Sequence, residues 1–433
     1  MSINASANNA TEDRIISLDN LRYFSVLCVI ILHATPAYII GTSAWWPVID
    51  PDRTLTASIL ATFFDAFAMP LLFYIAGFFA IPTIQRKGIA LFLKGKLSRL
   101  GIPWIICILT INPITLLIAY YLRNKLTLAT SFGDLWLSYI QHFAEFTFRI
   151  RNWSSDPVPQ YFQGYMWFIS MLFVFFLIFA FIYKVKRNWF TTINESCKPV
   201  NASISKTLQF LFLAGFLTFF LSEILIFFLV IPVTRDPEAW VSFSGFIELQ
   251  PSRLFLHMIY FVLGILTYKN KWIERAIFPG HLTTWTISFF ILLFIFYSAN
   301  ILYINNIYLK SPRNVIIIYG TAAFFLRNLL TMSILGLFMA LALRYWNRPT
   351  KINRNLASNS YDMYIAHYPI VIILQFALFF IPGIPGLIKF GVVSTLSIIF
   401  TYSVSQFLMK PFPRMTAASV FILLIIMFVF IRP

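Results

Sequence analysis

Long apolar runs dominate the sequence, and short polar segments separate them. Many runs reach the ~17–25 residues that an α-helix needs to cross a bilayer. Pro411 and Pro413 precede the last run, which we expect to form a further transmembrane or interfacial helix. The pattern predicts an all-α, polytopic membrane helical bundle with about ten or eleven transmembrane helices. The expected spans lie near 21–41, 57–81, 100–122, 162–183, 207–231, 253–268, 282–304, 317–343, 360–381, 386–409 and 415–431.

The composition and the placement of charge support a membrane protein. Only 11% of the residues are charged and 59% are hydrophobic, whereas soluble domains average about 25% charged residues. Most of the 33 Lys and Arg residues fall in the N-terminal tail and in every second loop. This is the positive-inside pattern, and it predicts a cytoplasmic N-terminus. The net charge of +17 therefore indicates topology and contact with membrane lipids, not a nucleic-acid partner. We expect a multi-pass protein of the cell inner (plasma) membrane.

Three regions follow from this reading. Residues 1–20 form a polar, partly acidic cytoplasmic tail that does not resemble a cleavable signal, so the first span is expected to remain. Residues 21–410 form one membrane domain, and 411–433 add the C-terminal helix. The long outer connection 123–161 is expected to be a partly helical cap. The sequence has no paired-cysteine zinc pattern and no glycine-rich phosphate loop, so we expect no metal site.

The first apolar run carries an arginine at its cytoplasmic end and a histidine well inside it. Arg22 and His33 are eleven positions apart, so on a helix they lie on one face and about 16 Å apart along the axis. Asp19 is three positions before Arg22 and can pair with it. The pattern indicates a polar site, although a topology signal and a structural histidine explain it as well.

A second polar face begins the ninth span. Ser360, Tyr364 and His367 are spaced i, i+4 and i+7, which places two hydroxyls and an imidazole on one helical face as a candidate hydrogen-bond relay. The alternative is polar contact between helices. Because both histidines are expected in the cytoplasmic-to-middle part of their helices, the two faces can meet in one cavity.

A third candidate lies at the cytoplasmic start of the third span. Lys96 and Arg99 are one helical turn apart, and two cations at that depth can hold the phosphates of a cytoplasmic donor. Positive-inside charge or contact with anionic lipid explains them as well.

Taken in order, these segments resemble the acyltransferase family 3 membrane proteins. Arg22-x10-His33, preceded by Leu-Asp-Asn-Leu, resembles the first-helix signature of that family. Two positions depart from its pattern, because Ala76 replaces a usual serine and Lys96 replaces a usual arginine. The branch that includes glucans biosynthesis protein C, a succinyl transferase, is the most similar. The other similar segments are MPLLFYIAGFF (69–79), KLSRLGIP (96–103), YMWF (165–168), YFVLG (260–264) and SYDMYIAH (360–367), within about residues 14–410.

The resemblance implies an enzyme, a membrane O-acyltransferase. It would move an acetyl or succinyl group from cytoplasmic acyl-CoA, its co-substrate, to a hydroxyl of an envelope or extracytoplasmic carbohydrate or glycolipid. The implied acyl-CoA-binding residues are Arg22, Lys96 and Arg99. His33 is the implied general base or acyl carrier, and His367 supports it or acts on the acceptor hydroxyl. No permanently bound cofactor is expected.

Further positions complete the implied site. Asp19, Ser360, Tyr361 and Tyr364 would orient the groups that act on the substrates. Trp167, at the outer end of the fourth span, would stack on a sugar ring, although interfacial tryptophans are usually membrane anchors.

A function of another class also fits the ionisable residues within the spans. A multi-pass transporter or flippase of a polar or lipid-linked solute would use His33, Asp65, Glu223 and Arg327 as a polar path. Transporters often contain inverted repeats, and the sequence shows no such symmetry.

Overall fold

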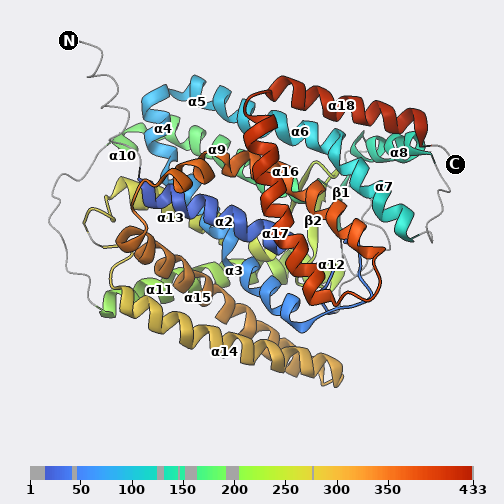
Figure 1. The fold of residues 1–433 in the computed structure, drawn as a ribbon. Coiled ribbons are helices and arrows are strands. Elements are labelled where there is room, and N and C mark those ends of the chain that lie inside the picture. The colour runs from blue at the N-terminus through green and yellow to red at the C-terminus, as the bar shows by residue number, and fades with distance from the viewer. Residues whose placement is uncertain are drawn as a thin grey trace, which may run out of the picture.

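The computed structural model is a helical bundle (Figure 1). It describes residues 15–40, 46–123, 131–144, 147–151, 163–191, 204–275 and 277–431. Within these residues, eleven segments are helical and apolar enough to cross a membrane. The helices among them and around them are α2 (Ile16–Ala34), α3 (Leu55–Phe78), α4 (Ala80–Lys87), α5 (Ile89–Lys96), α6 (Ile102–Leu109), α7 (Ile111–Arg123), α8 (Phe132–Ala144), α9 (Trp167–Val185), α10 (Arg187–Thr191), α11 (Ile204–Leu225), α12 (Ile231–Thr234), α13 (Pro251–Lys269), α14 (Leu282–Tyr308), α15 (Arg313–Tyr345), α16 (Lys351–Phe379), α17 (Gly386–Val404) and α18 (Pro413–Phe430).

The spans agree with the sequence prediction, but several helix ends differ. Helix α2 runs over Ile16–Ala34 and not over 21–41, and Pro36 lies two residues after its end. The third span begins at Ile89 and not near 100, because a π-turn over Leu97–Gly101 joins α5 to α6 and Pro103 lies at the start of α6. A proline in the first turn of a helix loses no hydrogen bond. Helix α16 begins at Lys351, nine residues before the expected start.

Helices α2, α3, α13, α15 and α16 form the interior of the bundle, where α2 packs against α3, α15, α16 and α17. Helices α14 and α18 lie at opposite edges (Figure 1) and bury little of their surface. Both are apolar all round, which suits a helix that faces lipid. Helix α18 is 18 residues long and apolar enough to cross the membrane.

Two glycines let α3 and α13 approach closely. A Cβ atom on Gly77 would lie 1.9 Å from the carbonyl oxygen of Phe261, and one on Gly264 would lie 2.0 Å from that of Tyr74. No larger residue fits at either position without separating the helices. Small residues at such contacts are a common device of membrane helix packing, and here they fix the helix that carries Asp65 against the helix that carries Arg253.

The outer end of the bundle has a small cap. Strands β1 (Phe148–Arg151), β2 (Trp240–Phe243) and β3 (Ile247–Leu249) form an antiparallel sheet in the order β1-β2-β3. Helix α8 packs against α7 and α18. The cap expected over 123–161 is thus partly helical where it is described. Residues 124–130, 145–146 and 152–162 lie outside the described part, as do residues 1–14 of the predicted tail.

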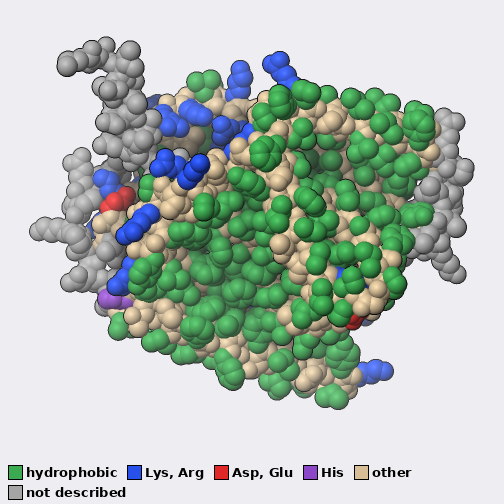
Figure 2. All heavy atoms as spheres, viewed as in Figure 1, with side chains coloured by type: hydrophobic (Ala, Val, Ile, Leu, Met, Phe, Trp, Pro, Cys, Tyr) green, Lys and Arg blue, Asp and Glu red, His purple; other side chains and the backbone are tan. Residues whose placement is uncertain are grey.

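Lys and Arg side chains gather at one end of the bundle. Figure 2 shows many of them along the left and upper left of this face, where the ends of α4, α5 and α10 lie in Figure 1, while hydrophobic side chains are the most frequent over the middle of the face. By the positive-inside rule this is the cytoplasmic end. The chain therefore forms a multi-pass helical membrane protein, as predicted.

Candidate functional site

Two histidines from opposite ends of the chain meet between α2 and α16. The Nε2 atom of His367 lies 3.3 Å from the Nδ1 atom of His33, and the ring centroids are 4.8 Å apart. His367 is fully buried, whereas His33 is only half-buried. The two faces predicted from sequence therefore come together, and His33 is the more exposed of the two histidines.

The surrounding carbonyls determine which ring nitrogens carry hydrogen. The carbonyl of Val29 lies 2.9 Å from Nδ1 of His33, and that of Tyr364 contacts Nδ1 of His367. A carbonyl only accepts, so we assign an N–H to both Nδ1 atoms. Nε2 of His367 then accepts from the shared Nδ1–H of His33, and Nε2 of His33 keeps its lone pair. This is the tautomer that a general base or nucleophile needs.

The histidine pair lies deeper than expected from the sequence. His33 is the penultimate residue of α2, so at 1.5 Å per residue it is about 26 Å along the helix from Ile16. His367 also lies beyond the midpoint of α16, which runs Lys351–Phe379. The pair is therefore nearer the outer than the cytoplasmic end of its helices, because α2 begins and ends earlier than the apolar run alone indicated.

Arg22 lies at the cytoplasmic end of the same helix pair. Its guanidinium contacts the Asp19 carboxylate at 3.1 Å, and it donates to Ser360 Oγ at 3.3 Å and to the Ala357 carbonyl at 3.1 Å. The Arg22 side chain is 38% exposed. Its charge is therefore held in place by α16 and remains open to the cytoplasmic side.

The two other predicted cations are not equivalent. The Lys96 ammonium lies 3.4 Å from the centroid of the Phe176 ring and 5.2 Å from that of Phe92, a cation–π arrangement. The backbone carbonyl of Arg99 accepts a hydrogen bond from the Tyr361 hydroxyl, which ties the third span to α16. Arg99 is thus linked to α16, the helix whose Ser360 and Ala357 accept hydrogen bonds from Arg22. Lys96 instead packs against aromatic rings of α5 and α9.

The predicted hydroxyl relay is not formed by the described contacts. Tyr364 donates its hydroxyl hydrogen to the Tyr165 carbonyl at 2.8 Å, and Tyr165 donates to the Ile365 carbonyl at 3.0 Å. The Tyr165 ring also stacks on Tyr368 at 4.6 Å. A tyrosine hydroxyl extends far from its own backbone, so it reaches the facing helix and not the imidazole on its own. These bonds position α16 against the start of α9.

Trp46 and Gln375 lie beside His33, a contact that the sequence did not predict. The Trp46 indole N–H donates to Gln375 Oε1 at 2.8 Å. The Gln375 amide donates in turn to the carbonyls of His33 and Ala34, at 3.3 and 3.1 Å. The Trp46 ring centroid is 6.0 Å from that of His33. A lone glutamine in an apolar span was the only sequence signal for this contact.

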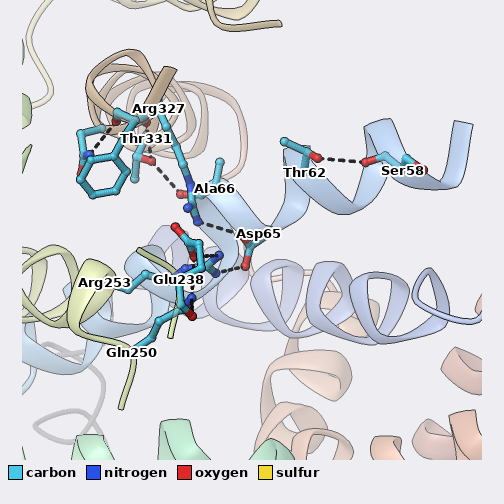
Figure 3. Close-up of polar contacts among 11 residues, drawn as sticks. Ser58, Thr62, Asp65, Ala66, Glu238, Gln250, Arg253, Arg327 and Thr331 are labelled. Atoms are coloured by element: carbon cyan, nitrogen blue, oxygen red, sulfur yellow. Dashed lines mark hydrogen bonds and ion pairs between the residues drawn. The ribbon is translucent and has the colours of Figure 1, made fainter. Parts of the chain in front are cut away.

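A cluster of ion pairs joins α3, α13 and α15 (Figure 3). Asp65 of α3 accepts from Arg253 of α13 and, at 2.7 Å, from Arg327 of α15. Arg253 also contacts Glu238 at 3.3 Å. Sequence reasoning noted Asp65 and Arg327 as membrane charges but did not predict that they pair, and it did not single out Arg253.

Trp167 lies at the start of α9, as expected, but its ring has neighbours. Its centroid is 5.2 Å from that of His257 and 6.0 Å from that of Trp240. Any sugar that stacks there would share the ring with this protein contact. Among the described residues, no group of three or more His, Cys, Asp or Glu side chains could hold a metal ion.

Comparison with known proteins gives one match. A family model described as an acyltransferase domain, of the acyltransferase 3 type, matches residues 15–430. No curated protein and no solved structure matches the chain.

Proposed function

Because the chain belongs to the acyltransferase 3 family, we propose that it is an O-acyltransferase. It transfers an acetyl or succinyl group from cytoplasmic acyl-CoA to a hydroxyl of an extracytoplasmic or envelope carbohydrate. Membership makes it a membrane acyltransferase and favours this class over the transporter. We further propose that the protein lies in the inner membrane and belongs to the branch that includes glucans biosynthesis protein C.

The observation that carries the proposal is the His33–His367 pair. In the proposed reaction, Nε2 of His33 removes the proton from the acceptor hydroxyl, and the oxygen attacks the thioester carbonyl. The C–S bond then breaks, and the CoA thiolate takes the proton from the imidazolium. His367 is a positioning residue, because its Nε2 accepts from Nδ1–H of His33 and favours the imidazolium that forms.

The donor is proposed to enter from the cytoplasmic end. Arg22 and Arg99 provide cations there, and guanidinium groups suit phosphate. About 16 Å of helix separates Arg22 from His33, a distance that the extended arm of CoA can cross while its phosphates stay at the surface. Lys96, packed against Phe176, would contribute charge at longer range.

The principal experiment measures acyl transfer by the purified protein in detergent. We expect His33→Ala to abolish acceptor-dependent CoA release while acyl-CoA still binds. His281→Ala is the matched control, because His281 is exposed at the start of α14, and it should retain full activity. Normal turnover by His33→Ala would refute the mechanism. An acylated His33 trapped by mass spectrometry would replace the general base with an acyl carrier.

A second experiment tests the donor site. We expect Arg22→Ala to raise the Kd for acetyl-CoA or succinyl-CoA about tenfold or more, since a charge-assisted contact is lost, and to leave the KM for the acceptor unchanged. Arg313→Ala is the control, because Arg313 is exposed at the opposite end of the bundle. An unchanged donor Kd would show that the phosphates bind elsewhere.

A further inference from the structure

The ion-pair cluster of Asp65, Glu238, Arg253 and Arg327 has no role in the donor chemistry. It joins three transmembrane helices and the outer loop that precedes β2 (Figure 3). Its two carboxylates and two guanidinium groups balance in charge. Gln250 adds an amide that donates to the backbone carbonyl of Glu238 at 2.9 Å.

The cluster is partly open. The exposed fraction of the side chain is 30% for Asp65, 45% for Glu238, 22% for Arg253 and 12% for Arg327. Charged groups that face lipid are costly, so charges inside a membrane bundle face its interior or a water-filled space. The exposed parts of these charged side chains therefore face water and not lipid.

The cluster lies close to the helix that carries the proposed catalytic group. Asp65 lies on α3, which packs directly against α2, the helix that carries His33. A molecule bound at the cluster would therefore lie one helix away from His33, on the side opposite to the cytoplasmic arginines.

Two buried polar atoms in and beside the cluster lack a hydrogen-bond partner among the described residues. His257 is 2% exposed, and its Nδ1 atom has no hydrogen-bond partner among the described residues. The same holds for Nε of Arg253. The His257 ring lies between the rings of Phe73 and Trp167, with centroids 4.7 and 5.2 Å away. Buried polar atoms are normally satisfied, so these two atoms indicate a missing partner.

We propose that this cluster is the acceptor site and that it selects a neutral, polyhydroxylated sugar. Carboxylates accept hydrogen bonds from hydroxyls and guanidinium groups donate to them, while the balanced charge gives no net attraction for an acidic sugar. The nearby Trp167 ring offers an apolar face. The proposal rests on the proposed function, and it adds the class of acceptor and the residues that bind it.

The test uses the full-length enzyme in detergent with acetyl-CoA and succinyl-CoA. The probes are neutral hexose disaccharides and their uronic-acid counterparts, and the readout is sugar-stimulated CoA release. We expect a neutral disaccharide to stimulate release more than its acidic counterpart. Glu238→Gln should raise the KM for that sugar about tenfold or more, since one charged hydrogen bond is weakened, and should leave kcat and the KM for the donor within about twofold.

Glu223→Gln is the matched control, because it makes the same chemical change in α11, away from the contacts of the cluster. Its KM for the sugar should not change. A thermal unfolding midpoint measured for both variants separates loss of binding from loss of fold. Arg327→Lys, which keeps the charge but loses the planar fork, should likewise raise the acceptor KM.

Each other outcome decides against at least one of the two proposals. Better stimulation by acidic sugars, or an unchanged KM in folded Glu238→Gln, would overturn the acceptor assignment alone. No stimulation by any sugar while both donors still bind would overturn the acceptor assignment together with the carbohydrate acceptor of the proposed function. Absence of binding and of CoA release with both donors would instead overturn the proposed function.

Discussion

Removing the buried ion pair between Asp50 and Lys389 should destabilise the protein strongly. The Lys389 ammonium lies 2.7 Å from Asp50 Oδ2, and the side chains are only 3% and 1% exposed. Asp52 strengthens the same junction, because its carboxylate accepts from the backbone N–H of Gly386 at 2.6 Å. The pair fastens the outer segment that follows α2, which includes Trp46, to the start of α17. Burial and the nearby Asp50 carboxylate also raise the pKa of Tyr38, so its hydroxyl stays neutral.

The magnitude follows from burial. In Lys389→Met the methionine fills a similar volume, but Asp50 keeps a charge without its partner. Leaving one charge of a buried pair uncompensated typically costs about 3–5 kcal/mol, whereas replacing both partners is often close to neutral. We therefore expect Lys389→Met and Asp50→Asn each to lower the free energy of unfolding by about 3 kcal/mol or more. The double variant should recover most of that loss.

Equilibrium unfolding of the purified protein in mixed micelles measures all four members of this double-mutant cycle. Lys310→Met is the control, since Lys310 is exposed at the same end of the bundle, and it should change the unfolding free energy by less than about 0.5 kcal/mol. If Lys389→Met costs less than about 1 kcal/mol, or if the two single changes add in the double variant, the argument from uncompensated charge is wrong. Catalytic activity should fall in the variants that lose stability, because the segment with Asp50 also carries Trp46, which packs beside His33.

Further predictions concern the site and the packing. His367→Gln keeps an acceptor for Nδ1–H of His33, so it should retain more activity than His367→Leu. We expect the kcat of His367→Leu to fall about 10²–10⁴-fold, as it does when the orienting residue of a catalytic triad is replaced. Equal rates for the two folded variants would contradict this. Gly264→Ala places a methyl group against a backbone carbonyl of α3 and should lower the unfolding free energy by about 1–3 kcal/mol or more. Gly391→Ala, which meets open space, is its control in the same unfolding assay. Binding of acyl-CoA should weaken as salt rises, because Arg22 is exposed and its attraction to phosphate is screened; titrations at two ionic strengths measure this, and salt-independent binding would exclude an electrostatic donor site.

The sequence alone determined the class of fold and the order of the spans. In a bilayer every backbone polar group must be satisfied within the protein, so a long apolar run has few options besides a helix. This is why the eleven predicted runs correspond to the eleven candidate spans. Hydropathy does not determine where each helix begins and ends, because the ends depend on local contacts. The start of α2 at Ile16, for example, lies among polar residues that hydropathy assigns to the tail.

Part of the candidate site also follows from sequence. The helical repeat places Arg22 and His33 on one face, and the motifs that resemble the family point to His367 and Arg99. The helical repeat does not determine which hydrogen-bond partner each side chain has on a neighbouring helix. Tyr364 was expected to serve the imidazole on its own helix, yet its hydroxyl donates to the carbonyl of Tyr165 on another.

Only the tertiary structure decided the pairings between distant segments. His33 meets His367 across 334 positions, and Asp65 meets Arg327 across 262. A charge or an imidazole in an apolar span signals that a partner exists, because burying it alone is costly. Which partner it finds depends on how the helices pack, and that depends on close contacts such as Gly264 against Tyr74. The sequence thus determined which residues need partners, and the packing of the bundle determined which partners they have.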